Sequence, residues 1–233
     1  MEVSPPKSVR SRPPRAARAS QRSFGRSRLI GRYPALDSCW RDIRAAIETL
    51  HDVFASGRKL LICGNGGSAA DSEHIVGELM KGFLKKRPVD DGVRKRLKAI
   101  AGSEGAEIAS CLQGALPAIA LTSQVSLNSA ISNDTRASMV FAQQVYGLGE
   151  AGDALLGIST SGNSSNVVKA FIVAKGKNLH TIALTGRSGG RLISLADVAI
   201  RVPADGVAEI QELHLPVYHA LCIALEDRFF ASS

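Results

Sequence analysis

Five hydroxyl side chains crowd the segment 158–166, Ile-Ser-Thr-Ser-Gly-Asn-Ser-Ser-Asn, where an apolar run gives way to a helical pattern. They belong to Ser159, Thr160, Ser161, Ser164 and Ser165. Hydroxyls and free backbone N–H groups at the start of a helix bind anions, above all phosphate. The segment has no lysine, so it is not a Walker A loop, and it suits the phosphate of a small molecule. The alternative is an ordinary serine-rich helix cap, although a cap needs only one hydroxyl.

A glycine-rich turn, Gly-Asn-Gly-Gly-Ser-Ala, occupies residues 64–69 directly after another apolar run. It matches a variant of the dinucleotide-binding fingerprint, which also requires an acid about 20 residues later at the end of a strand. That region instead contains Lys85, Lys86 and Arg87, with no strand before it, so dinucleotide binding is the weaker interpretation. We expect the turn to bring Ser68 to the same anion as the serine-rich segment.

Four further side chains have the chemistry of zinc ligands. His74 and Glu78 are four residues apart on a predicted helix and share a face. Gln211 and His219 are eight apart on the last predicted helix, roughly 80° around its axis. Two histidines, a glutamate and a glutamine could hold a zinc ion, and the alternative is a polar contact on the surface or in the core. His214, on another face of that helix, fits the polar alternative better.

The elements that must position these residues alternate along the chain. Short apolar runs predict five strands, at 59–63, 117–122, 153–159, 180–184 and 198–202. Helical spacing predicts the main helices at 35–56, 69–83, 164–177 and 209–230, with one or two short surface helices in 84–116 and helical pieces up to 148. Asp37 or Ser38 is expected to cap the first of these helices.

Strands that alternate with helices indicate βαβ units and a parallel sheet. The strands are almost continuously apolar, which is typical of a sheet covered on both faces. The predicted fold class is therefore α/β, a three-layer sandwich with a five-stranded parallel sheet flanked by helices. Ligands of such sheets bind beyond the carboxyl ends of the strands, and the glycine-rich turn and the serine-rich segment both follow such ends.

The net charge of +8 comes from the N-terminus of the 233-residue chain. Residues 1–34 carry eight arginines and Lys7 against the single acid Glu2, while the remaining residues have equal numbers of basic and acidic groups. We divide the chain into a disordered basic tail, 1–33, and one domain, 34–233, because the tail lacks an apolar face to bury. The tail could be a nucleic-acid arm, a transit peptide or a segment without function. The neutral domain itself offers no basic face for nucleic acid.

The cysteines and the hydropathy of the chain indicate the cellular compartment of the domain. The four cysteines are far apart and form no CxxC pair, which excludes a zinc ribbon and argues against a disulfide framework. No apolar run reaches the roughly 18 residues needed to span a bilayer. We therefore expect a cytoplasmic protein with no membrane partner and four ordinary thiols.

Four motifs in order resemble the sugar isomerase (SIS) domain family, and most of all its phosphoheptose isomerase branch. They are Cys63-Gly64-Asn65-Gly66-Gly67-Ser68, the segment 157–164, Leu184-Thr185-Gly186 with Gly189 and Gly190, and Ile210-Gln211-Glu212 with His219. The resemblance covers about residues 35–230. It implies the SIS fold, typically a homotetramer with active sites between subunits, and interconversion of sedoheptulose 7-phosphate with a heptose 7-phosphate through an enediol.

The resemblance also implies roles for individual residues. The expected phosphate- and substrate-binding residues are Asn65, Gly66, Ser68, Ser159, Thr160, Ser161, Ser164 and Gln211. The expected zinc ligands are His74, Glu78, Gln211 and His219. Glu78 also matches the catalytic base and His219 the catalytic acid–base. A carboxylate suits removal of a proton beside a carbonyl, and an imidazole can move protons at the oxygens.

The chain departs from the family pattern where the sugar is contacted. Gln124 stands where the heptose enzymes have an acid, another acid is replaced near Val207 and Ala208, and residues 90–116 are longer. The reaction class is thus better supported than the substrate. The alternative function is a non-catalytic SIS protein, either a phosphosugar sensor or a tetrameric scaffold that binds the bacterial replication initiator. The presence of Glu78 with His219 favours the enzyme.

Overall fold

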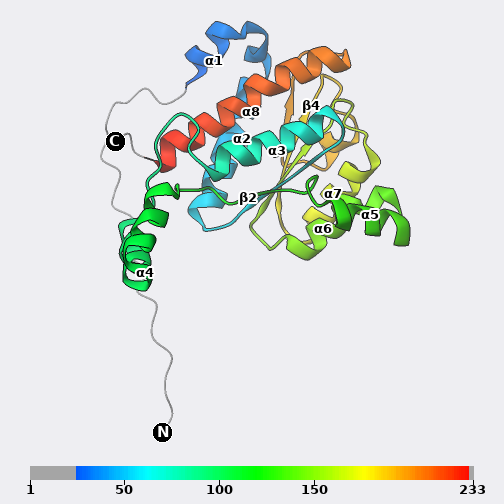
Figure 1. Cartoon of the computed structure of the whole chain (residues 1–233). Helices are drawn as coiled ribbons and strands as arrows, with labels where there is room; N and C mark the ends of the chain where they lie inside the picture. The colour runs from blue at the N-terminus through cyan, green and yellow to red at the C-terminus, as the bar shows by residue number, and fades with distance from the viewer. Residues whose placement is uncertain (1–24, 231–233) are drawn as a thin grey trace.

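A five-stranded parallel sheet forms the centre of the computed structural model, which describes residues 25–230 (Figure 1). The strand order is β2-β1-β3-β4-β5. The strands are β1 Leu60–Gly64, β2 Ala118–Ala120, β3 Ala154–Ile158, β4 His180–Thr185 and β5 Val198–Arg201. All pairings are parallel, as expected for strands joined by helical crossovers. The predicted strands are confirmed, although β2 is shorter than its apolar run.

Side chains of successive strand residues point to opposite faces of the sheet and so build two cores. Leu60 and Ile62 of β1 face the core beneath α2, α3 and α8, whereas Leu61 and Cys63 face the core beneath α5, α6 and α7. These helices are α2 Trp40–Ala55, α3 Gly67–Met80, α5 Val125–Asp134, α6 Val140–Leu148, α7 Ser165–Gly176 and α8 Val207–Phe229. The predicted three-layer sandwich is confirmed.

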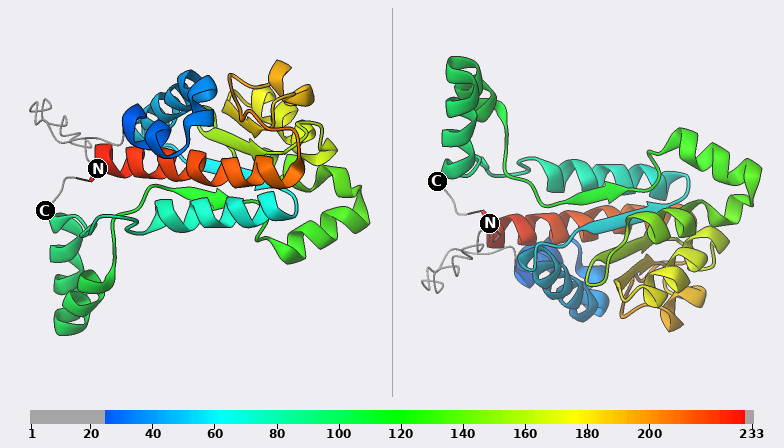
Figure 2. Two further views of the ribbon diagram at one scale, coloured as in Figure 1. Left: turned by 90° about the horizontal axis from the view of Figure 1, so that it is seen from above. Right: turned by 90° about the horizontal axis from the view of Figure 1, so that it is seen from below.

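Helices α3 and α8 run side by side in the same direction along one face of the molecule (Figure 2). Near their starts, Gln211 of α8 lies against Gly67 of α3. Beyond the end of α3, the backbone N–H of Phe83 donates to Glu226 of α8. The two predicted halves of the metal site are therefore carried by neighbouring helices.

The folded body includes residues that the sequence assigned to the tail. Residues Arg26–Arg32 form helix α1, and the 3₁₀ helix η1 follows at Pro34–Cys39. Leu29 is only 2% exposed and belongs to the core under α2, while Arg26 pairs with Asp37. The boundary expected at residue 34 is therefore wrong for residues 25–33, because one leucine packs despite the basic composition. The rest of the predicted tail, 1–24, lies outside the described residues.

The long segment between α3 and β2 carries helix α4, Asp91–Cys111. Two residues inside it, Ala101 and Gly102, have non-helical backbone angles, so α4 consists of two helices joined at a kink. Figure 2 shows α4 standing away from the sheet at one end of the molecule. Pro88 and Gln113 form an isolated antiparallel bridge, which brings the two ends of the segment together. The predicted short surface helices are confirmed.

Smaller features differ from or agree with expectation. Helix α2 begins at Trp40 with Cys39 at its N-cap, and neither Asp37 nor Ser38 caps it, because the preceding turn is 3₁₀.

All four cysteines are free thiols. Within residues 25–230, every helix is too short or too polar to cross a bilayer.

Candidate functional site

The strand order reverses between β1 and β3, which are neighbours in the sheet although β2 separates them in sequence. In open α/β sheets, ligands bind outside the carboxyl ends of the strands at such a point. The glycine-rich turn follows β1 and the serine-rich loop follows β3, so both open at this position. Asn65 and Asn166 join the two loops through reciprocal amide hydrogen bonds of 3.0 and 2.8 Å.

The hydroxyls expected to bind phosphate gather around these two loops. Ser159 and Ser164 lie with their Oγ atoms 2.9 Å apart, and Ser159 is buried. Ser68, in the first turn of α3, is buried as well. Ser161 is exposed, and its Oγ accepts a hydrogen bond from the backbone N–H of Asn163. Because α7 begins at Ser165, its free N–H groups face the same region, so the loop has the composition of an anion site.

Glycines allow the serine-rich loop to pack directly on the turn after β4. Gly162 has φ +65°, and a side chain there would collide with the carbonyl of Gly189. The backbone N–H of Gly186 donates to the Thr160 carbonyl, and that of Leu192 donates to the Gly162 carbonyl. The loop is thereby held in one conformation by backbone groups, which leaves its hydroxyls available to a ligand.

A hollow of about 190 Å³ adjoins the loop, lined in part by Thr160, Ser161 and Ile210. Arg187 and Asp205 also line it and pair at 3.0 Å. No sequence motif pointed to either residue, and the family pattern predicted that an acid is replaced near Val207. Asp205 lies only two residues before Val207, so a carboxylate is present in this region after all. The other changed position, Gln124, lies exposed at the N-cap of α5.

The predicted catalytic residues lie further along α3 and α8. Glu78 Oε1 is 3.2 Å from His74 Nε2, and its other oxygen is 3.4 Å from Lys81 Nζ. The carboxylate is 13% exposed, so two cationic or potentially cationic partners stabilise a partly buried charge. The ring centroids of His74 and His219 are 5.1 Å apart, which places all three predicted side chains in one cluster.

Burial and neighbours set the proton chemistry of His219. Burial lowers its pKa, the nearby His74 lowers it further, and Glu78 opposes both effects. A neutral imidazole at neutral pH can both accept and donate a proton. Among the described residues, its buried Nε2 has no hydrogen-bond partner. Such an unpaired buried nitrogen is costly unless a ligand engages it.

Tyr218 orders the other side of this cluster, and the sequence analysis missed it. Its hydroxyl donates to Asp71 Oδ1 at 3.1 Å and lies 3.2 Å from His74 Nδ1. Burial raises the pKa of Tyr218, so the hydroxyl stays protonated. Burial also raises the pKa of Asp71, against the opposing effects of Tyr218 and His74.

Gln211, the fourth expected zinc ligand, lies far from the cluster of His74, Glu78 and His219. Its side chain packs on Gly67 at the start of α3, where a Cβ atom would lie only 2.7 Å from Gln211 Nε2. Glu78 is three turns further along α3, roughly 16 Å away by helical rise. Within residues 25–230, no group of three or more His, Cys, Asp or Glu side chains is arranged to hold a metal. The donor types suit zinc and His219 Nε2 is available, but one chain does not assemble the predicted ligand set.

His214 is the remaining histidine of interest on α8, and it is fully buried. Burial lowers its pKa to about 4, so the ring is neutral at neutral pH. His214 thus lies in the core and away from the cluster, and among the described residues neither ring nitrogen has a hydrogen-bond partner, so the polar contact expected for it is not seen.

Comparison with known proteins identifies the relatives of this arrangement. The SIS domain family matches residues 35–106 and 104–186. A phosphoheptose isomerase from Geotalea daltonii is 40% identical over 188 residues, which cover 81% of this chain and 84% of that protein. One from Dechloromonas aromatica is 41% identical over 195 residues, covering 82% and 86%.

Solved structures agree with the sequence relatives. A phosphoheptose isomerase from Neisseria gonorrhoeae superposes with a TM-score of 0.67 and 34% identity, over 86% of this chain and 94% of that one. The enzyme from Francisella tularensis gives the same TM-score with 32% identity, over 86% and 92%. With the resemblance in the four motifs and the five-stranded fold, these matches place the chain in the SIS domain family, among the phosphoheptose isomerases.

Proposed function

We propose that the protein is an aldose–ketose isomerase that acts on a phosphorylated sugar, most like sedoheptulose 7-phosphate. The observation that carries the proposal is the cluster of Glu78 with His74 and His219 on a fold that also presents the hydroxyl-rich loop. The named relatives are phosphoheptose isomerases that this chain matches over most of their length. A merely sugar-binding protein would not need a carboxylate and an imidazole placed together.

In the proposed complex, the serine-rich loop binds the phosphate. Ser159, Ser161 and Ser164, together with the N–H groups at the start of α7, supply donors to its oxygens. Ser68 and Thr160 extend the donor set, while Asn65, Gly66 and Gln211 line the approach from the glycine-rich turn. Binding at this end fixes the reacting carbons relative to the protein, which lowers the entropic part of the barrier.

The proton transfer is assigned to Glu78 and His219. Glu78 removes the proton from the carbon next to the carbonyl and returns it to the neighbouring carbon, so that an enediol forms and collapses. His219 moves protons between the two oxygens, a task that suits an imidazole whose pKa burial keeps low. His74 and Lys81 hold the Glu78 carboxylate, and Tyr218 holds His74.

We also propose a homotetramer with active sites between subunits. In one chain, Ser68 lies roughly 15 Å from Glu78 along α3, and Gln211 lies roughly 12 Å from His219 along α8. A second copy would bring a hydroxyl-rich loop to the Glu78 cluster. Met80, Leu215 and Val207 are large apolar residues exposed on α3 and α8, as expected of surfaces that a second copy covers.

Zinc is part of the proposal only in that assembly. The ligands would be His74, Glu78 and His219 of one copy and Gln211 of a second, brought into metal-binding positions when the copies assemble, and zinc when bound polarises the substrate carbonyl. The unpaired Nε2 of His219 and the nitrogen and oxygen donors support this assignment. We place the enzyme in the cytoplasm, in keeping with its four free thiols.

The test of the function is turnover of sedoheptulose 7-phosphate in deuterated water, beside a panel of C5 to C7 sugar phosphates. The proposal predicts isomerisation of at least one of them, with deuterium incorporated at C1 or C2. Inactivity of the metal-loaded wild type on the whole panel would favour a non-catalytic SIS protein.

A mixing experiment tests the shared site. Purified Glu78→Gln and Ser159→Ala variants, each of low activity, are unfolded and refolded together. Sites built from two subunits predict that the mixture regains part of the wild-type activity, because some sites then combine two intact halves. Equal inactivity of the mixture and its components would argue for sites within one chain.

A further inference from the structure

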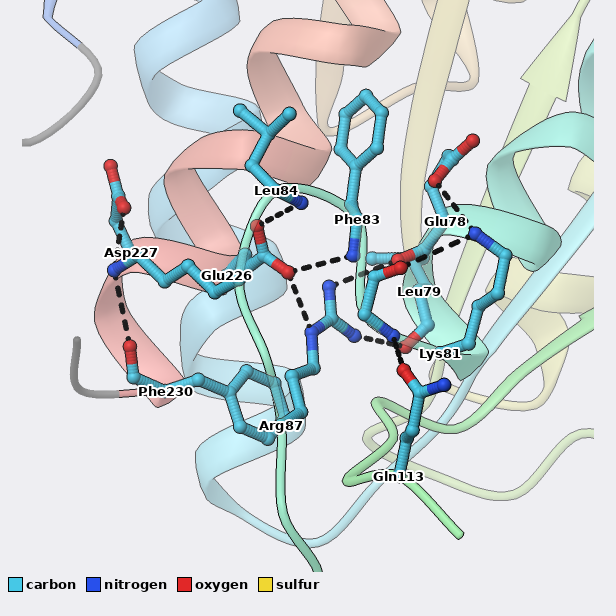
Figure 3. Close-up of polar contacts among 12 residues, drawn as sticks. Glu78, Leu79, Lys81, Phe83, Leu84, Arg87, Gln113, Glu226, Asp227 and Phe230 are labelled. Atoms are coloured by element: carbon cyan, nitrogen blue, oxygen red, sulfur yellow. Dashed lines mark hydrogen bonds and ion pairs between the residues drawn. The ribbon is translucent and has the colours of Figure 1, made fainter. Parts of the chain in front are cut away.

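Two oppositely charged side chains with no exposed surface meet behind the end of α3. Arg87, in the loop after α3, donates from Nε to Glu226 Oε1 of α8 at 2.8 Å, and both side chains are 0% exposed (Figure 3). The residues are 139 positions apart in the chain. A buried ion pair adds little net stability, because desolvation offsets the attraction. Its presence therefore calls for an explanation other than stability alone.

The guanidinium of Arg87 reaches the backbone of the catalytic residue itself. Nη2 donates to the carbonyl of Glu78 at 3.0 Å, and Nη1 donates to the carbonyl of Leu79 at 2.8 Å. The last carbonyls of a helix lack partners within that helix, and an arginine can cap them. Figure 3 shows Arg87 pointing into the end of α3, so this side chain caps the last turn that carries Glu78, together with the backbone N–H of Leu116, which donates to the Leu79 carbonyl at 2.9 Å.

The carboxylate of Glu226 reaches the neighbourhood of the second catalytic residue. Its two oxygens accept the backbone N–H groups of Phe83 and Leu84, at 2.9 and 2.8 Å. The Phe83 ring lies 5.4 Å from the His219 ring, centroid to centroid. Glu226 thus holds the loop that places Phe83 against His219. It lies seven residues after His219 on α8, two turns further along the helix.

We infer that Arg87 and Glu226 are positioning residues for catalysis, which fix the Glu78 end of α3 and the Phe83 packing of His219 relative to each other. The inference rests on the proposed roles of Glu78 and His219. Neither residue of the pair lies at the surface, so neither contacts the sugar. Each of the three guanidinium nitrogens has its own acceptor, a geometry that a lysine ammonium cannot reproduce.

A second ion pair with a buried carboxylate offers a control. Asp153 is 1% exposed, pairs with Lys59 at 2.7 Å, and lies just before β3, the central strand of the sheet. Removal of its charge perturbs an ion pair whose carboxylate is buried, and the hydrogen bonds of Asp153 go to the backbone N–H groups of Lys59 and Glu150 rather than to α3 or α8. Asp153→Asn therefore shows how loss of an ion pair outside the catalytic cluster changes stability and kcat.

The experiment compares Arg87→Met, Arg87→Lys and Glu226→Gln with Asp153→Asn, in steady-state kinetics on the sugar phosphate that the wild type turns over. A catalytic group displaced by about 1 Å costs up to 100-fold in rate. We expect kcat of Arg87→Met to fall 10- to 100-fold with KM within about threefold, and Arg87→Lys and Glu226→Gln to lie between it and wild type. Asp153→Asn should lower the Tm while kcat stays within twofold.

A crystal structure of Arg87→Lys, the more conservative change, supplies a readout that does not need turnover. We expect the last turn of α3 to shift and the Glu78–His219 separation to change. Wild-type kcat in the Arg87 and Glu226 variants, or an unchanged Glu78–His219 separation, would overturn the inference. If the wild type is inactive on every sugar phosphate while the turn does shift, the proposed function fails and the positioning of Glu78 by Arg87 stands.

Discussion

The hydroxyl of Tyr218 lies 3.2 Å from Nδ1 of His74 while it donates its proton to Asp71. The tyrosine oxygen can then accept from His74 Nδ1–H, and Nε2 of the same ring lies 3.2 Å from Glu78 Oε1, a contact that is a hydrogen bond when Nε2 also carries a proton. A chain of three polar contacts therefore runs from Asp71 to the proposed base. Tyr218 is 1% exposed, so water does not compete for these contacts.

Tyr218→Phe removes only the hydroxyl that orients His74. We expect kcat to fall about tenfold with KM little changed, and the free energy of unfolding to fall by about 1 kcal/mol, the worth of an ordinary hydrogen bond. Steady-state kinetics and urea unfolding measure the two effects. Tyr146→Phe, at a residue 66% exposed, is the control and should change neither. Wild-type kcat in Tyr218→Phe would show that His74 needs no orientation.

Glu78→Gln keeps the size of the side chain and removes the base. Loss of a general base typically costs 10²- to 10⁴-fold in rate, so we expect a folded protein that binds the sugar phosphate and turns it over at least 100-fold more slowly. Deuterium exchange at the substrate carbon should slow in parallel. The control is Glu73→Gln on the same helix, where the carboxylate only accepts a hydrogen bond from Thr122. Rapid exchange in Glu78→Gln would assign the base elsewhere.

Ser161→Ala tests the phosphate loop at its exposed hydroxyl. Hydrogen bonds to charged groups contribute about 1.5–3 kcal/mol, which corresponds to a rise in KM of about 10- to 150-fold. Ser165→Ala, one turn away at the exposed start of α7, should leave KM within twofold. The loop would not be the phosphate site if the unphosphorylated sugar bound wild type as tightly as its phosphate.

His214 makes stability depend on pH. Its folded pKa of about 4 is below the unfolded value of about 6.5, so the unfolded chain takes up the proton first as the pH falls. Stability should therefore decline between pH 6.5 and 4, by on the order of 3 kcal/mol in total. Urea unfolding at several pH values measures the slope, which His214→Leu should flatten. His180→Asn, at an exposed histidine, should retain it. An unchanged slope in His214→Leu would contradict the assignment.

Leu29 tests the corrected boundary of the folded body. Leu29→Ala should lower the free energy of unfolding by about 2 kcal/mol, because a buried leucine is truncated. Ser27→Ala on the same short helix removes no buried group and should have no measurable effect. Thermal or urea unfolding distinguishes the two variants. Equal stability of both would mean that α1 contributes nothing to the core.

Local patterns predicted the fold well because the central strands are built around apolar runs. β1 and β3 are buried throughout and carry no polar side chain, and β4 has the apolar run 182–184 at its centre. The proximity of His74 and Glu78 followed in the same way from their spacing on one helix face. Gln211 and His219 were placed by rotation around α8 alone, and the rise between them, roughly 12 Å, keeps Gln211 from the catalytic cluster.

The remaining contacts of the site join residues that no local pattern connects. Tyr218 and Asp71 are 147 positions apart, and their contact depends on how α3 and α8 are placed against each other. In the sequence, Arg87 is one of three consecutive basic residues, a pattern typical of a surface loop. It is buried because Glu226, which is distant in sequence on α8, pairs with it. Leu29 stands among arginines, so the basic composition of the segment predicted disorder, although this one apolar side chain packs in the core.

The bridge between Pro88 and Gln113 has a consequence for the evolution and engineering of the chain. Since the two ends of the α4 segment already touch, a change in its length adds little loop-closure entropy, about 0.6 kcal/mol for each doubling. The length of this segment can therefore change while β2 keeps its place in the sheet. The kink at Gly102, exposed and far from the strands, is accordingly the place where a fluorescent reporter domain can be inserted into a working enzyme.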